Sequence, residues 1–137
     1  MKFHHVGISV ADLDRSKKWY ADVLGFSEGY HFELPPVSLC GCFMERDGVQ
    51  VELIERAGSV PARGGPDPNA ALLTHGYGHL AFTVHDLDAT FERLVTAGAA
   101  AVWEPRPSPQ PGVRMAFVAD VDGNLIEIME AVPGKTA

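Results

Sequence analysis

The sequence contains two copies of one pattern, and this duplication limits the possible folds more than any other feature. The segment His5–Asp14 aligns with His79–Asp88 at an offset of 74 residues, sharing the histidine, a valine five positions later and the final Asp-Leu-Asp. Further along, Asp47–Glu55 aligns with Asp122–Glu130 at an offset of 75 residues. Two matching pairs whose offset changes by one residue indicate a repeated supersecondary unit. The chain is therefore predicted to hold two similar modules.

Each module is predicted to begin with a strand followed by a helix. Residues 3–10 alternate between apolar and small or polar side chains, which is typical of a half-buried strand. Asp12 is suited to begin a helix and Gly25 to end it, and Asp86 and Gly98 repeat this arrangement. Three further strands are expected in each module, over residues 27–34, 37–45 and 48–55 and over residues 100–105, 113–119 and 124–130. The predicted fold class is α+β, with two βαβββ modules.

The expected organisation follows from this order of elements. We expect the first module over residues 1–55 and the second over 77–131. Residues 56–76 are rich in proline, glycine and alanine and are expected to form a connecting arm, and 132–137 a tail. A chain of 137 residues has room for one globular domain or two small fused modules.

Composition and charge narrow the classes of partner. Eleven Lys and Arg against 18 Asp and Glu give a net charge of −7, which argues against nucleic acid or an anionic membrane as partner. The sequence has no apolar run long enough to span a membrane, and its N-terminus has no secretory pattern. The two cysteines, Cys40 and Cys42, are expected to be reduced core thiols. These features predict a cytoplasmic protein that acts on a small molecule.

Four duplicated side chains interrupt the apolar strands: His5, Glu52, His79 and Glu127. An unpaired carboxylate in such a position is costly, because burial disfavours its charged form. One explanation is a pair of buried His–Glu salt bridges. The other is a divalent cation, since imidazole and carboxylate together suit Ni, Zn, Co, Mn or Fe. The shared register of all four residues favours one bound metal ion. His4, His31, His75 and His85 have no such counterparts and are expected to be surface or loop residues.

The sequence resembles the vicinal oxygen chelate superfamily of glyoxalases, bleomycin-resistance proteins and extradiol dioxygenases. The resemblance rests on His5–Leu13, Trp19-Tyr20 and Leu24-Gly25-Phe26, and it is closest to bacterial glyoxalase I in Tyr77–Ala81 and Phe117–Ile128. It implies that the paired modules form an incomplete barrel whose concave face holds the metal. It also implies that the four family ligand positions fall on His5, Glu52, His79 and Glu127.

The resemblance further implies a glyoxalase I-like lyase or isomerase, which removes a proton next to a metal-bound carbonyl group. Glu127 is the expected base and Glu52 its pseudo-symmetric counterpart. Ser9 and Thr83, on the same strand faces as the histidines, are expected to contact substrate. Ser9 also stands where glutathione-dependent members of the family carry an arginine, which argues against lactoylglutathione as the substrate.

Three alternatives remain open. An acyl-CoA epimerase of the methylmalonyl-CoA type uses similar chemistry, although such enzymes usually have glutamine at the position of Glu52. A ring-cleaving dioxygenase has three protein ligands and none at that position. A drug-binding resistance protein generally lacks the set of four ligands. The resemblance also implies a homodimer, in some relatives with modules exchanged between chains.

Overall fold

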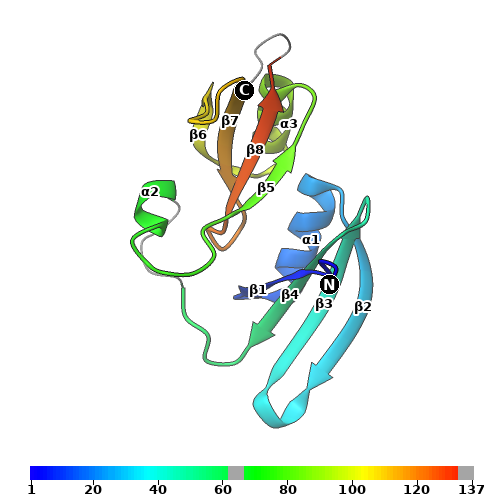
Figure 1. Ribbon diagram of the computed structural model, residues 1–137. Coiled ribbons are helices and arrows are strands. Elements are labelled where there is room, and N and C mark those ends of the chain that lie inside the picture. Colours follow the sequence, from blue (N-terminus) through cyan, green and yellow to red (C-terminus); the bar gives the residue numbers. More distant parts are fainter. Residues whose placement is uncertain (62–66, 133–137) are drawn as a thin grey trace. The chain divides into compact units, whose positions relative to one another are not determined.

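A computed structural model describes residues 1–61 and 67–132 (Figure 1). The chain divides into two compact units, Met1–Pro61 and Ala62–Ala137. Apart from Val132, the expected tail lies outside the described residues, as does the stretch 62–66 of the expected arm.

The first unit has the predicted βαβββ order. Its elements are β1 (Val6–Val10), α1 (Leu13–Leu24), β2 (Ser27–Leu34), a 3-10 turn η1 (Pro35–Val37), β3 (Leu39–Arg46) and β4 (Val49–Arg56). The four strands form one sheet in the order β1-β4-β3-β2, in which β1 runs parallel to β4 and the other pairs are antiparallel. One face of this sheet packs against α1 through the buried side chains of Leu13, Trp19, Tyr20, Val23 and Leu24.

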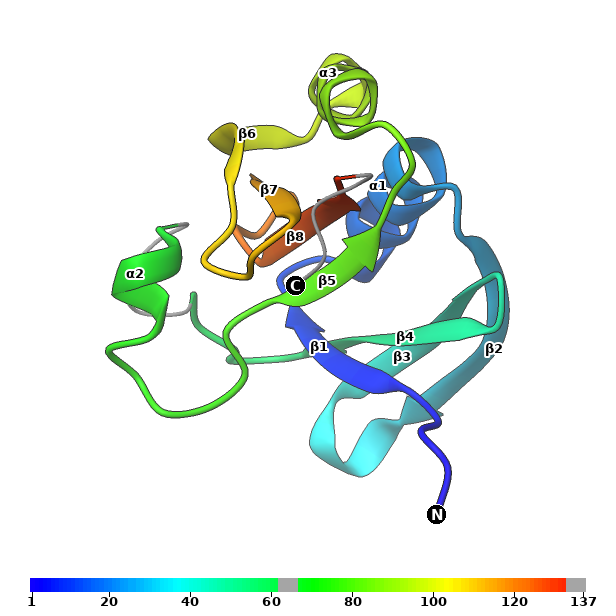
Figure 2. The same cartoon turned by 45° about the horizontal axis from the view of Figure 1, so that its top comes forward.

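The second unit repeats this arrangement. It contains α2 (Pro68–Ala71), β5 (Leu80–Thr83), α3 (Leu87–Ala97), β6 (Ala100–Pro107), β7 (Val113–Ala119) and β8 (Leu125–Ala131). The sheet order is β5-β8-β7-β6, with β5 parallel to β8. The helix α3 lies across one face of this sheet (Figure 2).

Both long helices begin and end as the sequence predicts. The carboxylates of Asp12 and Asp86 accept hydrogen bonds from the backbone N–H groups of Arg15 and Ala89, at 2.8 and 2.9 Å. Each helix ends at a glycine with a positive φ, 72° at Gly25 and 116° at Gly98. Glycine adopts this left-handed conformation without the steric cost that other residues incur.

The one-residue change of offset between the repeats lies in the last turn of the second module. In the first module Arg46 pairs with Val49 across a two-residue turn, whereas in the second Ala119 pairs with Leu125. The longer turn closes on buried Asp120, whose carboxylate accepts hydrogen bonds from the backbone of Asp122 and Asn124 and from the Asn124 side chain. These bonds satisfy turn groups that the strand ladder leaves unpaired.

Two local expectations differ from the structure. The first strand begins at Val6 rather than at residue 3, because its ladder with β4 starts at the Val6–Val51 pair. The expected arm contains a short helix, α2, which is capped by the Asp67 carboxylate. His31, expected to be a surface or loop residue, is a surface residue: it lies within β2 with a half-exposed side chain.

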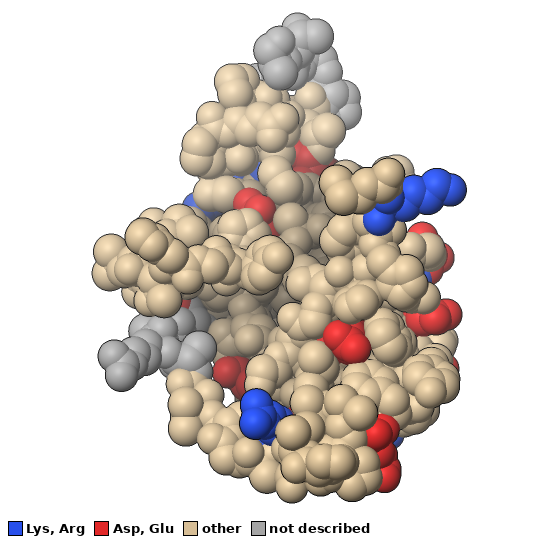
Figure 3. All heavy atoms as spheres, turned by 60° about the horizontal axis from the view of Figure 1, so that its bottom comes forward, with Lys and Arg blue, Asp and Glu red and all other residues tan. Residues whose placement is uncertain are grey.

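The surface and the helices add two observations. On the face drawn in Figure 3, the Lys and Arg side chains stand apart and do not form a patch. Among the described residues, the helices are too short or too polar to cross a lipid bilayer.

Candidate functional site

The two histidines occupy equivalent places at the beginning of a strand. His5 directly precedes β1 and His79 directly precedes β5, so neither interrupts the middle of a strand as the sequence pattern predicted. Both β1 and β5 are edge strands, so each has a neighbouring strand on one side only. A side chain at the start of such a strand contacts fewer residues than one in the middle of the sheet. The His5 and His79 side chains accordingly remain 32% and 34% exposed.

The two glutamates lie within the strands that pair with β1 and β5. Glu52 on β4 is opposite Gly7, and Glu127 on β8 is opposite Ala81. Gly7 leaves space for the carboxylate, because a Cβ atom at this position would lie 3.2 Å from Glu52 Oε2. The small residues that the sequence pattern placed on these faces therefore lie beside the acidic groups.

Each module brings its histidine and glutamate together. His5 Nε2 lies 3.3 Å from Glu52 Oε2, and His79 Nε2 lies 3.2 Å from Glu127 Oε2. The carboxylates are more enclosed than the imidazoles, with Glu52 18% and Glu127 11% exposed. The register of the repeated sequence is thus reproduced as two similar side-chain pairs, one in each unit.

An aromatic ring that the sequence pattern did not single out supports each histidine. Phe43 meets His5 edge to face, with ring centroids 5.1 Å apart at 89°, and Phe117 meets His79 at 5.1 Å and 90°. In the sheets, these phenylalanines pair directly with Glu52 and Glu127. Phe43 and Phe117 are also 74 residues apart, so the repeat offset could have identified them. Their rings limit the orientations open to the imidazoles.

The first pair has one more neighbour. His4 Nδ1 lies 2.7 Å from His5 Nδ1, so the expected surface residue His4 contacts the candidate ligand. A partner at the second ring nitrogen fixes the tautomer of a metal-binding histidine. In the second module Gly78 occupies the equivalent position and supplies no side chain.

The geometry of each pair suits two donors to one cation. Metal–nitrogen and metal–oxygen bonds of about 2.0–2.2 Å at right or tetrahedral angles place the two donor atoms roughly 3.0–3.4 Å apart. The observed separations of 3.3 and 3.2 Å fall in this range. Imidazole nitrogen with carboxylate oxygen suits first-row divalent ions. Each module therefore carries one imidazole nitrogen and one carboxylate oxygen at a separation that fits a shared divalent cation as well as an ion pair.

The expected substrate contacts lie on the same faces as these pairs. Ser9 is two residues beyond Gly7 on β1, and Thr83 is two residues beyond Ala81 on β5. The side chains of Ser9 and Thr83 are exposed. Both hydroxyl groups are thus accessible, each on the strand face that carries its module's glutamate.

Comparison with known proteins identifies the family. Residues 2–128 match the Glyoxalase/Bleomycin resistance protein/Dioxygenase superfamily. The chain is 35% identical over 133 residues to the lactoylglutathione lyase of Haemophilus influenzae, covering 95% of this chain and 93% of that protein.

Solved structures share the fold. A glyoxalase family protein from Enterococcus faecalis superposes with a TM-score of 0.81 at 22% identity, over 94% of this chain and 97% of that one. A glyoxalase I mutant (V278E) from Zea mays gives a TM-score of 0.74 at 24% identity, and the match covers 94% of this chain but only 44% of the maize chain. From its duplicated βαβββ modules and the match over residues 2–128, the chain belongs to the Glyoxalase/Bleomycin resistance protein/Dioxygenase superfamily.

Proposed function

We propose that the protein is a divalent-metal-dependent lyase or isomerase of the glyoxalase I type. In this proposal His5, Glu52, His79 and Glu127 together hold one metal ion, within one chain or between the exchanged modules of a homodimer. The observation that carries the proposal is the duplicated His–Glu pair, at 3.3 Å in one module and 3.2 Å in the other. The Haemophilus influenzae relative named lactoylglutathione lyase supports the reaction class.

The chemistry required is the movement of a proton between two carbons next to a carbonyl group. A bound divalent ion would supply Lewis acidity, which stabilises the negative charge that develops on the carbonyl oxygen. Glu127 Oε2 would accept the proton and return it to the neighbouring carbon. Glu127 suits this task because it is the more enclosed of the two carboxylates, with 11% of its side chain exposed. Glu52 would act on the opposite face of the substrate.

The aromatic and small residues would give the site its shape. Phe43 and Phe117 would hold the imidazoles in a fixed orientation and exclude water from one side of each His–Glu pair. Ser9 and Thr83 would donate or accept hydrogen bonds from substrate oxygens. Ser9 provides no positive charge, so we expect thiols other than glutathione to serve as well as or better than glutathione.

The test combines metal analysis with isotope exchange. Protein purified without added metal would be analysed for Ni, Zn, Co, Mn and Fe, then assayed with the hemithioacetals of methylglyoxal formed from glutathione and from a neutral thiol. In deuterated water, an enzyme of this type incorporates solvent deuterium next to the carbonyl group. We expect bound metal, turnover, and loss of both when His5 and His79 are replaced by glutamine.

Other outcomes would point to the remaining classes. Isotope exchange in an acyl-CoA thioester without hemithioacetal turnover would indicate an epimerase. Oxygen consumption with a catechol would indicate a dioxygenase. A protein that neither retains nor responds to any of the five metals would contradict the proposal and favour a ligand-binding protein.

A further inference from the structure

A second group of metal-binding side chains lies on the opposite face of the first sheet. Glu28 and His31 on β2 and Cys42 on β3 place one oxygen, one nitrogen and one sulfur atom within 4.8 Å of one another. Phe43 pairs with Glu52, so the neighbouring residue Cys42 points to the other face, the one covered by α1. Neither repeat motif of the sequence includes these three residues.

A bulge in β2 brings the group together. In a regular strand, residues three positions apart point to opposite faces. In β2, the register with β3 shifts between Glu28 and His31, so that Glu28 pairs with Met44 and His31 with Cys42. Met44 and Cys42 are two residues apart on β3 and therefore share a face. The side chains of Glu28 and His31, which pair with them, lie on that same face. Bulges of this kind commonly redirect a side chain at a functional site.

The backbone at the bulge is specified by Gly29. A Cβ atom at this position would lie 3.1 Å from the Phe43 carbonyl oxygen and 3.1 Å from Glu45 Oε1. A larger residue would push β2 away from β3. The close approach that Gly29 permits therefore holds the three donor groups together.

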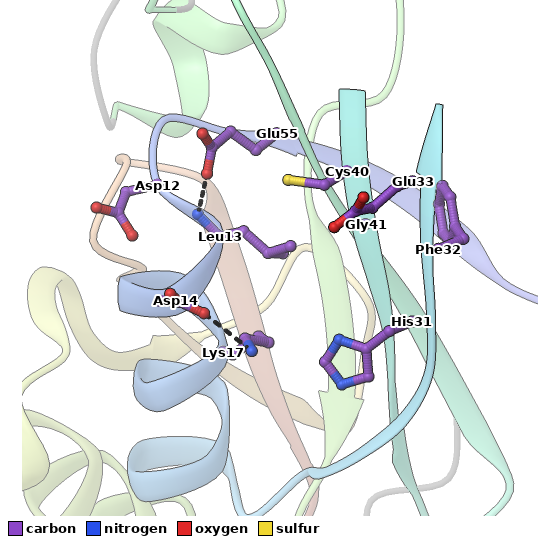
Figure 4. Close-up of a pocket in the computed structure, with 10 residues that line it drawn as sticks. All are labelled: Asp12, Leu13, Asp14, Lys17, His31, Phe32, Glu33, Cys40, Gly41 and Glu55. Carbon is purple, nitrogen blue, oxygen red and sulfur yellow. Dashed lines mark hydrogen bonds and ion pairs between the residues drawn. The ribbon is translucent and has the colours of Figure 1, made fainter. Parts of the chain in front are cut away.

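The distances within the group suit a cation. His31 Nε2 lies 3.0 Å from Glu28 Oε2 and 3.4 Å from Cys42 Sγ. Cys42 is fully buried, whereas the Glu28 and His31 side chains are 47% and 49% exposed. The sulfur would therefore form the inner side of a site that ions enter from solvent. His31 also borders an open hollow of about 480 Å³ beside the beginning of α1, in which its ring faces Lys17 (Figure 4).

A cation already neutralises part of this group. Lys17 Nζ lies 3.3 Å from Glu28 Oε2 and 3.0 Å from Asp14 Oδ1. The hydrogen bond to Asp14 contributes most to raising the Lys17 pKa above its usual value, and Glu28 adds to the effect. A divalent ion at Glu28 would compete with this ammonium group, which would keep Asp14 as its partner.

We propose that Glu28, His31 and Cys42 form a second metal site, selective for thiophilic divalent ions such as zinc or cobalt. Binding replaces the thiol proton of Cys42, which passes to the buffer, and displaces Lys17 from Glu28. One thiolate, one carboxylate and one neutral imidazole balance the charge of a divalent ion. A mixed sulfur, nitrogen and oxygen set with one position left open to solvent is within the range that zinc accepts.

The test uses cobalt as a spectroscopic probe of the full chain, freed of metal and kept reduced. Cobalt bound to a thiolate gives a sulfur-to-metal charge-transfer band in the near ultraviolet, whereas cobalt bound to histidine and glutamate alone gives none. The signal is therefore independent of the proposed His5, Glu52, His79 and Glu127 site. Because the proposed His5, Glu52, His79 and Glu127 site would also take up cobalt, we expect the band to be complete by two equivalents, with the intensity of one thiolate-bound ion, and to disappear when excess zinc is added.

Four variants make the assignment specific. Cys42→Ser should abolish the band, and Cys40→Ser, which removes the other thiol on the same strand face, should leave it unchanged. His31→Gln, at a half-exposed position that should not disturb folding, should weaken cobalt binding by more than about tenfold. Lys17→Gln should strengthen binding, because it removes the competing ammonium. Circular dichroism would establish that each variant is folded.

Three results would overturn the proposal. The wild-type protein could show no charge-transfer band after two equivalents of cobalt. The band could depend on Cys40 rather than Cys42. It could also persist at unchanged affinity in His31→Gln, which would indicate adventitious binding to a single thiol.

Discussion

The two modules share the His–Glu pair but differ in what surrounds it. At equivalent positions of the outer strands, the first module pairs Phe32 with Gly41 and the second pairs Arg106 with Met115. In the first, the Phe32 ring covers the glycine; in the second, the Arg106 guanidinium lies 4.8 Å from the centroid of the Trp103 ring. The duplicated His–Glu pairs are thus combined with an aromatic ring in one module and a cation in the other. The repeat therefore preserves the His–Glu pair while the residues around it differ in size and charge.

The largest expected effect concerns the two glutamates. If Glu127 is the base, Glu127→Gln should lower turnover by about 10²–10⁴-fold, the usual range for general base catalysis. Glu52→Gln, at the same place in the other module, should cost less. Turnover and metal content would be measured together for both variants. Full turnover by metal-loaded Glu127→Gln would show that the proton is moved by another group.

The next effect concerns stability in the first module alone. A Cβ atom at Gly41 would meet the Phe32 ring and lie 3.0 Å from the Leu53 carbonyl oxygen. Gly41→Ala should therefore lower the free energy of unfolding by about 1–3 kcal/mol, as overpacking does elsewhere. Chemical denaturation would measure it. In the double variant, Phe32→Leu should recover part of the lost stability. If the effects of the two substitutions on the free energy of unfolding simply add, the strain does not come from the Phe32 ring.

A smaller effect, on substrate binding, is expected from Arg106, whose counterpart in the first module is the uncharged Phe32. Arg106 pairs with Met115, which pairs with Met129 on the face of Glu127, so its charge lies on the proposed substrate side of the second sheet. Arg106→Gln should raise KM for an anionic thiol conjugate by about two- to fivefold, as expected for an exposed ion pair. KM for a neutral conjugate should not change. Equal effects on both conjugates would indicate that the residue acts through packing.

The smallest effect concerns the ion pair that the aspartate in the first turn of each long helix forms, and the loss of that ion pair at low pH. Asp88 on α3 forms a two-point ion pair with Arg114 on β7, at 2.6 and 2.9 Å, and this hydrogen bonding lowers the Asp88 pKa. The ion pair stabilises the folded protein fully when the pH is above the pKa that the aspartate has in the unfolded chain. This stabilisation is lost as the pH falls through the lower pKa that Asp88 has in the folded protein. The equivalent residue Asp14, 92% exposed, pairs with Lys17 on its own helix.

The melting temperature should therefore depend on pH differently in two variants. Between about pH 5 and pH 3, Asp88→Asn should weaken the decline seen in the wild type, because one acid-sensitive ion pair has been removed. Asp14→Asn should leave the decline nearly as it is, since an exposed pair within one helix contributes little. Identical pH profiles for the two variants would contradict the proposed difference.

Much of the fold could be predicted because its signals are local. Strand alternation, the caps at Asp12 and Asp86 and the glycines at Gly25 and Gly98 each act within one element. The start of β1 at Val6 was missed, because the extent of a strand depends on where its partner begins. The supporting ring Phe43 was also missed, because it pairs with Glu52 only across the sheet.

The sequence by itself determined the duplication and the βαβββ order, and it singled out His5, Glu52, His79 and Glu127 as candidates, because polar residues repeated in register in and beside apolar strands are visible along the chain. Only the tertiary structure decided which atoms meet. The 3.3 and 3.2 Å pairs, the rings against the histidines and the bulge that joins Glu28 to His31 depend on strand register. Register is set by contacts between residues far apart in the chain, and these form only when the sheet assembles.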